Sequence, residues 1–162
     1  MTTNLSGTSV TKNESLYEQD FYLWLKTTAQ MLRNRQLDDV DLDNLIEEIE
    51  DMGKDKRREL QSRLRVLLMH LLKYQYQPER RSSSWISMIL EQFDQIESLL
   101  KNSPSLKPYY LEIFAETYLK AVKFASAETK LPIKIFPSES PFSPEDVINS
   151  DFIFATVNQE EV

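Results

Sequence analysis

Residues 64–76 read LRVLLMHLLKYQY, and this segment decides the fold because apolar side chains fill most of its positions. Its polar interruptions are Arg65, His70, Lys73 and Gln75. A helix that is apolar around most of its circumference is typical of the centre of a helical core. Pro78 ends the segment, since proline disfavours helical geometry at the residue before it. We therefore predict that the centre of the core is formed by Leu64, Leu67, Leu68, Leu71 and Leu72.

Apolar side chains at helical spacing continue on both sides of this segment. The expected helices cover residues 15–36, 42–52, 54–76, 84–100 and 105–128. The expected N-terminal caps are Asp39 or Asp41, Ser83 or Ser84, Ser105, and Ser143 before Pro144. After Leu131 the prolines of LPIKIFPSESPFSPEDV predict a partly extended tail with one short helical turn.

Gly53 allows two interpretations of the region around it. In the first, Gly53 takes the left-handed conformation after a helix with one apolar face, and the chain reverses there. The acidic residues 38–51 would then lie against the basic segment KDKRRELQSRLR, residues 54–65. In the second, Gly53 kinks one long helix; if the chain runs straight there, the basic half is available to phosphate or to an acidic partner. The sequence leaves both open.

Composition supports an all-helical protein. Gly7 and Gly53 are the only glycines, whereas strand-and-turn folds need glycine at positive φ. A chain of 162 residues can bury one sizeable core. We predict an all-α, single helical bundle-like domain of about five helices over residues 15–155. A disordered lead-in over residues 1–14 and an acidic tail over residues 156–162 complete the expected organisation.

Net charge and the lack of cysteine restrict the expected partners. The formal net charge of −7 disfavours general binding to nucleic acid or to an anionic membrane. No apolar run approaches the roughly 20 residues of a membrane span, and the start has no apolar core of a secretory signal. The absence of cysteine removes disulfides and thiolate metal sites and fits a cytoplasmic location. We expect no cofactor, and the oligomeric state stays open.

Three ordered stretches carry a family resemblance. They are LIEEIEDMGKDKRRELQSRLRVLLMHLLKYQYQPERRSSSW (residues 45–85), SPSL (103–106) and FPSESPFSPEDVI (136–148). Together they resemble the domain-of-unknown-function family twenty-nine, common in cyanobacteria, over about residues 16–155. The resemblance implies an all-helical fold and supplies no activity or catalytic residue. Ser140 stands where the family pattern has a cysteine, so this position carries no thiol.

The acidic residues and the lone histidine are the candidates for chemistry. Residues 38–51 hold eight carboxylates, which suit a divalent cation but are interpreted first as the solvated face of an amphipathic helix. His70 is interpreted first as a buried residue that ties two helices together. In the catalytic alternative, His70 would converge with Glu47, Glu48 and Asp51 across two helices. No metal site is predicted, since the chain lacks a second histidine.

The segment KYQYQPERRSSSW, residues 73–85, is the candidate binding surface. Tyr74 and Trp85 end two apolar stripes and are expected to fasten a corner between helices. The remaining surface candidates are Tyr76, Arg80 and Arg81, with Arg57 and Arg58 in the basic segment. Few exposed rings remain for stacking on single-stranded nucleic acid. The preferred function is a non-catalytic interaction or regulatory module with an unknown protein partner. The alternative is an enzyme of nucleic-acid or phosphate metabolism, for example a toxin–antitoxin component.

Overall fold

The computed structural model describes residues 15–158, which gather into two compact units. Unit 1 is described over residues 15–52 and unit 2 over residues 53–158. The structure is 83% helical, and residues 15–158 contain no strand, which confirms the all-α prediction. None of the helices within residues 15–158 has the length and apolar character of a membrane span. The predicted lead-in over residues 1–14 and the end of the predicted acidic tail, residues 159–162, lie outside the described residues.

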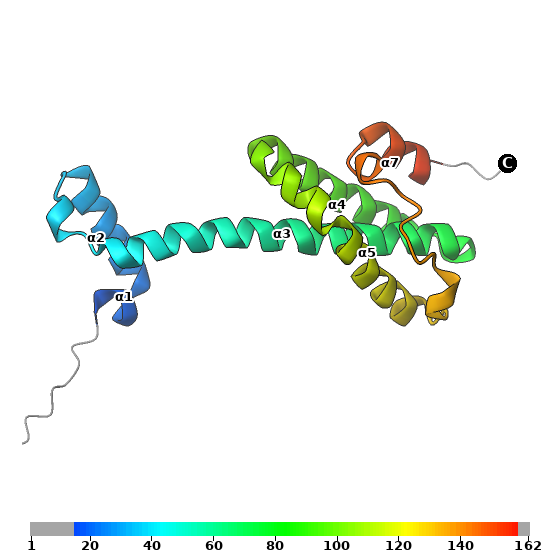
Figure 1. The fold of residues 1–162 in the computed structure, drawn as a ribbon, viewed down its shortest axis with the longest axis horizontal. Helices are drawn as coiled ribbons and strands as arrows, with labels where there is room; N and C mark the ends of the chain where they lie inside the picture. The colour runs from blue at the N-terminus through cyan, green and yellow to red at the C-terminus, as the bar shows by residue number, and fades with distance from the viewer. Residues whose placement is uncertain (1–14, 159–162) are drawn as a thin grey trace, which may run out of the picture. The chain divides into compact units, whose positions relative to one another are not determined.

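Unit 1 contains two short helices and the beginning of a long one (Figure 1). The elements are α1 (Leu16–Gln19), α2 (Phe21–Arg33), the 3-10 turn η1 (Leu37–Asp39) and the first part of α3 (Leu42–Tyr76). The single helix expected over residues 15–36 is wrong because Asp20 interrupts it. Asp20 leaves helical geometry, and its carboxylate accepts a hydrogen bond from the backbone N–H of Leu23 at 2.9 Å, as an N-cap does.

Helix α3 runs without interruption through Gly53. No described glycine has a positive φ, so the expected left-handed end of a helix at Gly53 is wrong. The long helix of the second interpretation is present over Leu42–Tyr76. Asp41 caps its start, since its Oδ1 accepts from the backbone N–H of Asn44 at 3.3 Å.

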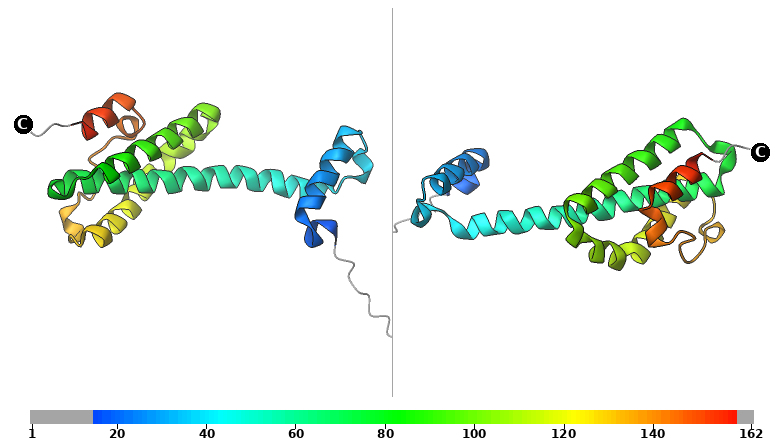
Figure 2. Two further views of the ribbon diagram at one scale, coloured as in Figure 1. Left: turned by 180° about the vertical axis from the view of Figure 1, so that it is seen from behind. Right: turned by 90° about the horizontal axis from the view of Figure 1, so that it is seen from above.

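Unit 2 is a helical assembly in which α4 and α5 gather around the C-terminal half of α3 (Figures 1 and 2). Its helices after α3 are α4 (Ser83–Asn102), α5 (Lys107–Thr129), α6 (Pro144–Val147) and α7 (Ser150–Val157). The 3-10 turns η2 (Pro78–Arg80), η3 (Pro104–Leu106) and η4 (Ile133–Ile135) connect them. The sequence predicts one domain over residues 15–155, and both compact units draw on α3.

The core of unit 2 is centred on α3, as the opening segment predicts. The exposed fraction is 0–1% at Leu64, Leu67, Leu68, Leu71 and Leu72. These side chains belong to a single hydrophobic cluster with residues of α4, α5, the tail and α7. The prediction of the core centre is confirmed, because a helix apolar on most sides can be surrounded by neighbours on most sides.

Serine side chains cap two of the helices of unit 2 for which the sequence predicts a serine cap. Ser82, rather than Ser83 or Ser84, caps α4, and its Oγ accepts from the backbone N–H of Trp85 at 3.3 Å. Ser105 lies inside η3 and caps nothing, because the proline before it starts a 3-10 turn that leads directly into α5. Ser143 caps α6 as predicted, with its Oγ accepting from the backbone N–H of Asp146 at 3.1 Å.

Two buried tyrosines of α5 hold the proline-containing tail. The hydroxyl of Tyr118 donates to the carbonyl of Pro137 at 2.7 Å, and that of Tyr110 donates to the carbonyl of Pro144 at 2.6 Å. Burial raises the pKa of Tyr118 to about 12 and raises the pKa of Tyr110 as well, so both hydroxyls stay protonated donors. Ser140, at the position without a thiol, donates to the carbonyl of Phe142 at 2.7 Å and closes a turn.

Candidate functional site

Unit 1 buries little of its own apolar surface. Its buried residues among 15–52 are Trp24, Thr28 and Val40. Around Trp24, the ring of Tyr17 lies edge-on at 4.9 Å between centroids, and the ring of Phe21 stacks at 5.9 Å. Within residues 15–52, unit 1 therefore has a small core and many exposed apolar side chains.

Helix α3 meets the rest of unit 1 through its acidic side. The hydroxyl of Tyr17 donates to the Glu48 carboxylate at 2.5 Å. This hydrogen bond is the main cause that raises the pKa of Tyr17 to about 12, with burial and the nearby Glu47 and Asp51 adding to it. Glu48 and Asp51 are half-buried. Asp43, Glu47 and Glu50 are exposed, as a solvated face requires, whereas Tyr17 of α1 contacts the Glu48 carboxylate.

Most of the apolar side of α3 in unit 1 is exposed, whereas Leu45 on that side is half-buried. We call Leu42, Ile46, Ile49 and Met52 the α3 stripe; their exposed fractions are 51–67%. The four positions lie within one side of the helix, since their spacings of three and four residues bring them together. The α2 residues Phe21, Tyr22, Leu23 and Leu25 are exposed as well. Exposed apolar side chains that adjoin one another along one side of a helix, as in the α3 stripe, are a feature of interaction sites.

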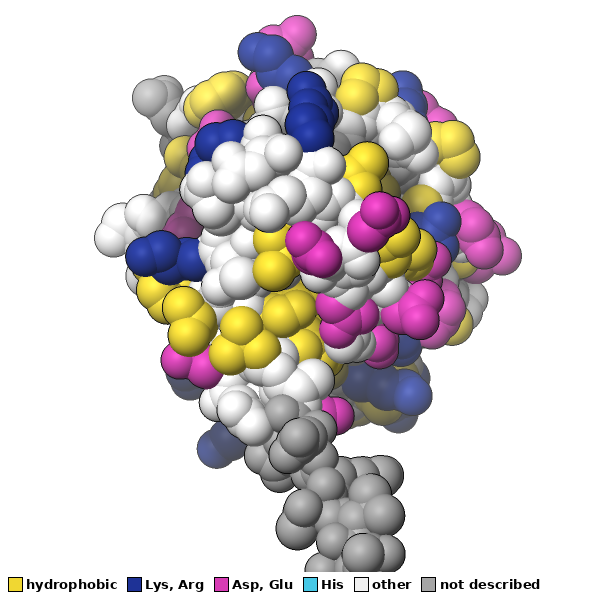
Figure 3. Space-filling view, turned by 90° about the vertical axis from the view of Figure 1, so that its left-hand side faces the viewer, with side chains coloured by type: hydrophobic (Ala, Val, Ile, Leu, Met, Phe, Trp, Pro, Cys, Tyr) yellow, Lys and Arg dark blue, Asp and Glu magenta, His cyan; other side chains and the backbone are white. Residues whose placement is uncertain are grey.

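Carboxylates dominate the charge of unit 1. Residues 15–52 contain ten carboxylate side chains and three cationic ones, a formal net charge of −7. Residues 53–162 are formally neutral, with fifteen of each sign. In Figure 3, which views the chain from the side of α1 and α2, hydrophobic side chains adjoin one another and carboxylates lie beside them. The surface of unit 1 is thus both apolar and strongly anionic.

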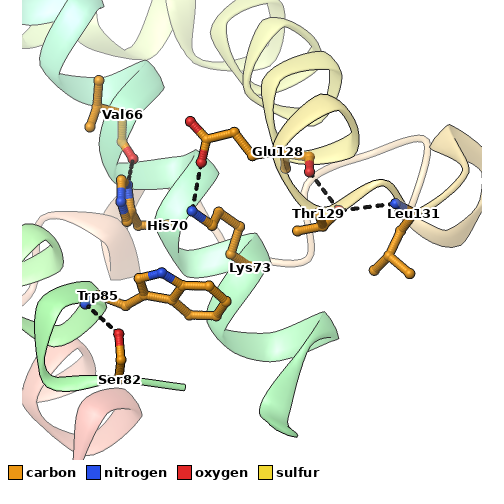
Figure 4. A network of polar contacts seen from close by, with 9 residues as sticks. Val66, His70, Lys73, Ser82, Trp85, Glu128, Thr129 and Leu131 are labelled. Atoms are coloured by element: carbon orange, nitrogen blue, oxygen red, sulfur yellow. Dashed lines mark hydrogen bonds and ion pairs between the residues drawn. The ribbon is translucent and has the colours of Figure 1, made fainter. Parts of the chain in front are cut away.

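Unit 2 contains a second candidate, a charged group buried between α3 and α5 (Figure 4). The ammonium of Lys73 donates to the Glu128 carboxylate at 2.6 Å and lies 4.6 Å from the centre of the Trp85 ring. The Lys73 side chain is 9% exposed and that of Glu128 is 48% exposed. A buried ammonium needs such partners, because desolvation without compensation is costly. The contacts explain the lysine as a structural tie between two helices.

His70 lies one turn before Lys73 on the same helix and is 7% exposed. Its Nδ1 lies 3.0 Å from the carbonyl oxygen of Val66, which can only accept, so Nδ1 carries the proton. Burial lowers the pKa of His70 from 6.5, with a smaller lowering from Lys73 and opposing contributions from the Val66 hydrogen bond and Glu128. The ring is therefore neutral at neutral pH.

This shift predicts a pH dependence of stability. Below about pH 6.5 the unfolded chain protonates His70 while the folded chain resists protonation, so the free energy of unfolding falls as pH drops through this range. In His70→Gln this part of the fall is missing. Urea unfolding between about pH 7 and about pH 5 should show a steeper loss for the wild type. Parallel pH profiles for the two proteins would contradict the buried, neutral state of His70.

The four catalytic candidates are divided between the two units. Glu47, Glu48 and Asp51 belong to unit 1, whereas His70 belongs to unit 2. Convergence across two helices required a chain reversal at Gly53, and α3 continues there. Within residues 15–158 no group of three or more histidine, aspartate or glutamate side chains is arranged to hold a metal ion.

The candidate binding residues have structural contacts in unit 2. The Arg81 Nε donates to the carbonyl of Tyr74 at 2.8 Å, which satisfies the end of α3. The ring of Tyr76 packs edge-on against Phe136 at 5.5 Å between centroids. Arg80 is exposed.

The two arginines of the basic segment are also engaged within unit 2. Arg57 lies 4.7 Å from the centre of the Tyr109 ring, and Arg58 pairs with Asp55 at 3.0 Å. Both remain exposed. These contacts leave their guanidinium groups reachable from solvent but give them no shared pocket.

Tyr74 and Trp85, the two aromatic residues expected at the corner between helices, differ in their burial. Tyr74 is buried, and its hydroxyl donates to the carbonyl of Val157 at 3.1 Å. Trp85 is half-buried beneath Lys73. The corner thus joins α3, α4 and α7, and one face of the Trp85 ring contacts the Lys73 ammonium.

Comparison with known proteins identifies the family and adds no activity. A family model described as "Domain of unknown function DUF29" matches residues 16–153. Neither the curated proteins nor the solved structures contain a match.

Proposed function

Since the chain belongs to this family of unknown function, we propose its role from its geometry: a non-catalytic protein-interaction module that docks a partner on unit 1. The single observation that carries the proposal is the exposure of the α3 stripe. A soluble protein gains stability by burying such side chains, each worth about 1.5–3 kcal/mol when fully covered. Unit 1 leaves this gain to a partner, while unit 2 supplies a folded body with its own core. The proposal keeps the cytoplasmic location that the cysteine-free sequence predicts.

The enzyme alternative has less support. A general acid or base must reach a substrate, and the His70 ring is enclosed and bound to a backbone carbonyl. Glu128, whose charge acts on His70, is paired with Lys73. The geometry therefore supports binding through unit 1 better than catalysis through His70.

Affinity capture from the native host tests the docking role. The baits are the wild type, the double variant Ile46→Ser/Ile49→Ser and the control Leu119→Ser. Leu119 is 52% exposed on α5, so the control removes an equally exposed side chain from unit 2. We expect proteins that the wild type and the control recover and the double variant loses. Identical recovery by all three baits would contradict docking on the α3 stripe.

A further inference from the structure

We propose that the partner segment is a cationic amphipathic helix, whose apolar face covers the α3 stripe and whose lysines and arginines meet the carboxylates of unit 1. This inference rests on the proposed docking function and adds the chemistry of the occupant. It follows from two independent observations, the apolar stripe and the charge around it.

The stripe is suited to a helix. Leu42, Ile46 and Ile49 follow the four- and three-residue spacing with which helices pack side by side, and Met52 borders them. The stripe spans about 15 Å, since a helix rises 1.5 Å per residue over ten steps. Gly53 follows the stripe, and a Cβ built there would meet nothing within 4 Å. A glycine at this point allows another backbone to approach closely.

The carboxylates select a cationic occupant. Asp43 and Glu50 are exposed and lie three and four residues from Ile46, so they border the stripe on one side. Glu47 is exposed on the same helix. Opposite charges around an apolar contact speed association and exclude wrong partners. Lysine and arginine at the edges of the docked helix supply this complement.

The same charge argues against other occupants. A second copy of the chain would bring two surfaces with a formal net charge of −7 each into contact. Like charges across an interface cost several kcal/mol. An anionic membrane or a nucleic acid would be repelled for the same reason. A basic protein helix is the occupant for which both the apolar and the charged part of the surface are favourable.

Designed peptides test this chemistry on the full chain. Three peptides of about fourteen residues, two heptads, are compared by titration calorimetry. One has leucine and lysine in an amphipathic helical pattern, one has the same pattern with glutamate in place of lysine, and one has the leucine–lysine composition in scrambled order. We expect binding of the first, and weaker or undetectable binding of the other two.

Variants locate the binding. Ile46→Ser/Ile49→Ser should weaken the leucine–lysine peptide at least about tenfold, since two contacts of more than 1 kcal/mol are lost. Glu47→Gln/Glu50→Gln should weaken it about two- to fivefold and flatten its salt dependence. Leu119→Ser and Glu91→Gln/Glu97→Gln, exposed positions of unit 2, should leave the affinity unchanged.

Each other outcome overturns the inference. If the glutamate peptide binds as tightly as the leucine–lysine peptide, charge does not select the occupant. If the scrambled peptide binds as tightly, the helical pattern does not. Binding that the unit 2 controls weaken as much as the unit 1 variants do is non-specific. The chain alone is also examined by sedimentation. If it forms a dimer that Ile46→Ser/Ile49→Ser abolishes, the α3 stripe binds a second copy of the chain.

The two proposals fail separately. If host proteins depend on the stripe but the leucine–lysine peptide does not bind, docking stands and the cationic helix is wrong. If the peptide binds at the stripe but the host capture is identical for all baits, the surface has the inferred chemistry and the docking function is wrong.

Discussion

Leu68→Ala should lower the free energy of unfolding of unit 2 by about 2–5 kcal/mol, the usual effect of removing a large buried aliphatic side chain. Leu68 is fully buried at the centre of the hydrophobic cluster, among side chains of α3 and of the helices around it. The truncation therefore removes apolar contacts and leaves a cavity that α3 cannot close by moving toward one neighbour. Urea unfolding followed by the fluorescence of Trp85, in a Trp24→Phe background, reports this change from unit 2 alone.

Leu119→Ala is the matched control for Leu68→Ala. Leu119 is the same residue type in unit 2 but lies half in solvent, so its truncation should change the free energy of unfolding by less than about 1 kcal/mol. A loss below about 0.5 kcal/mol for Leu68→Ala would place this helix at a surface, since exposed substitutions have effects of that size.

Trp24→Ala should unfold unit 1 and leave unit 2 intact. Deleting a buried tryptophan lowers stability by about 3–5 kcal/mol, which matches or exceeds all that a core of such a small unit supplies. Trp24 is the only large aromatic side chain buried within residues 15–52. Its loss removes the contacts of Tyr17 and Phe21 at once.

Amide hydrogen exchange measures this effect unit by unit. In Trp24→Ala, amides of residues 15–41 should exchange at the rate of an unfolded chain, while those of α4 and α5 keep their protection. Tyr22→Ala, an exposed aromatic on the same helix, should leave both units unchanged. Retained protection of α2 in Trp24→Ala would show that unit 1 does not depend on its small core.

The sequence predicts unit 2 well because there composition and burial agree. The run from Leu64 to Tyr76 is apolar on most sides, and neighbours surround it on most sides. The prolines that begin η2, η3 and α6 mark breaks in the helices close to where they occur. The predicted cap of α4, Ser83 or Ser84, lies one or two residues after the observed cap Ser82, since neighbouring serines offer the same hydroxyl to the same turn.

The sequence predicts unit 1 less well, because the apolar spacing of α3 does not show which side of this helix the rest of the unit contacts. The apolar spacing of Leu42, Ile46 and Ile49 predicts a helix with an inner face, and the helix is present. The contact of Tyr17 with Glu48 instead covers the acidic side. Which side of α3 is covered depends on packing against residues far away in the sequence. A glycine in the sequence can end a helix or lie within one, and Gly53, whose φ is not positive, lies within α3.

The Lys73–Glu128 pair shows another limit. Each residue interrupts an apolar stripe, and a charge on a buried stripe signals a partner of opposite sign. The two are 55 positions apart in the sequence, so spacing alone does not pair them. His70 is the only histidine in the sequence, but Lys73, one turn after it, makes the ion pair between α3 and α5.

Solvent access to the α3 stripe tests the central claim most directly. The chain has no cysteine, so Ile49→Cys carries a single thiol at the stripe, and Leu119→Cys carries one at a comparably exposed site of unit 2. Rates of alkylation are measured on the dilute chain with and without a saturating amount of the leucine–lysine peptide. The account predicts that both thiols react rapidly in the chain alone and that the peptide slows only the thiol of Ile49→Cys. Protection of that thiol in the chain alone, or equal rates with and without the peptide, would contradict the claim that the α3 stripe is an open docking surface.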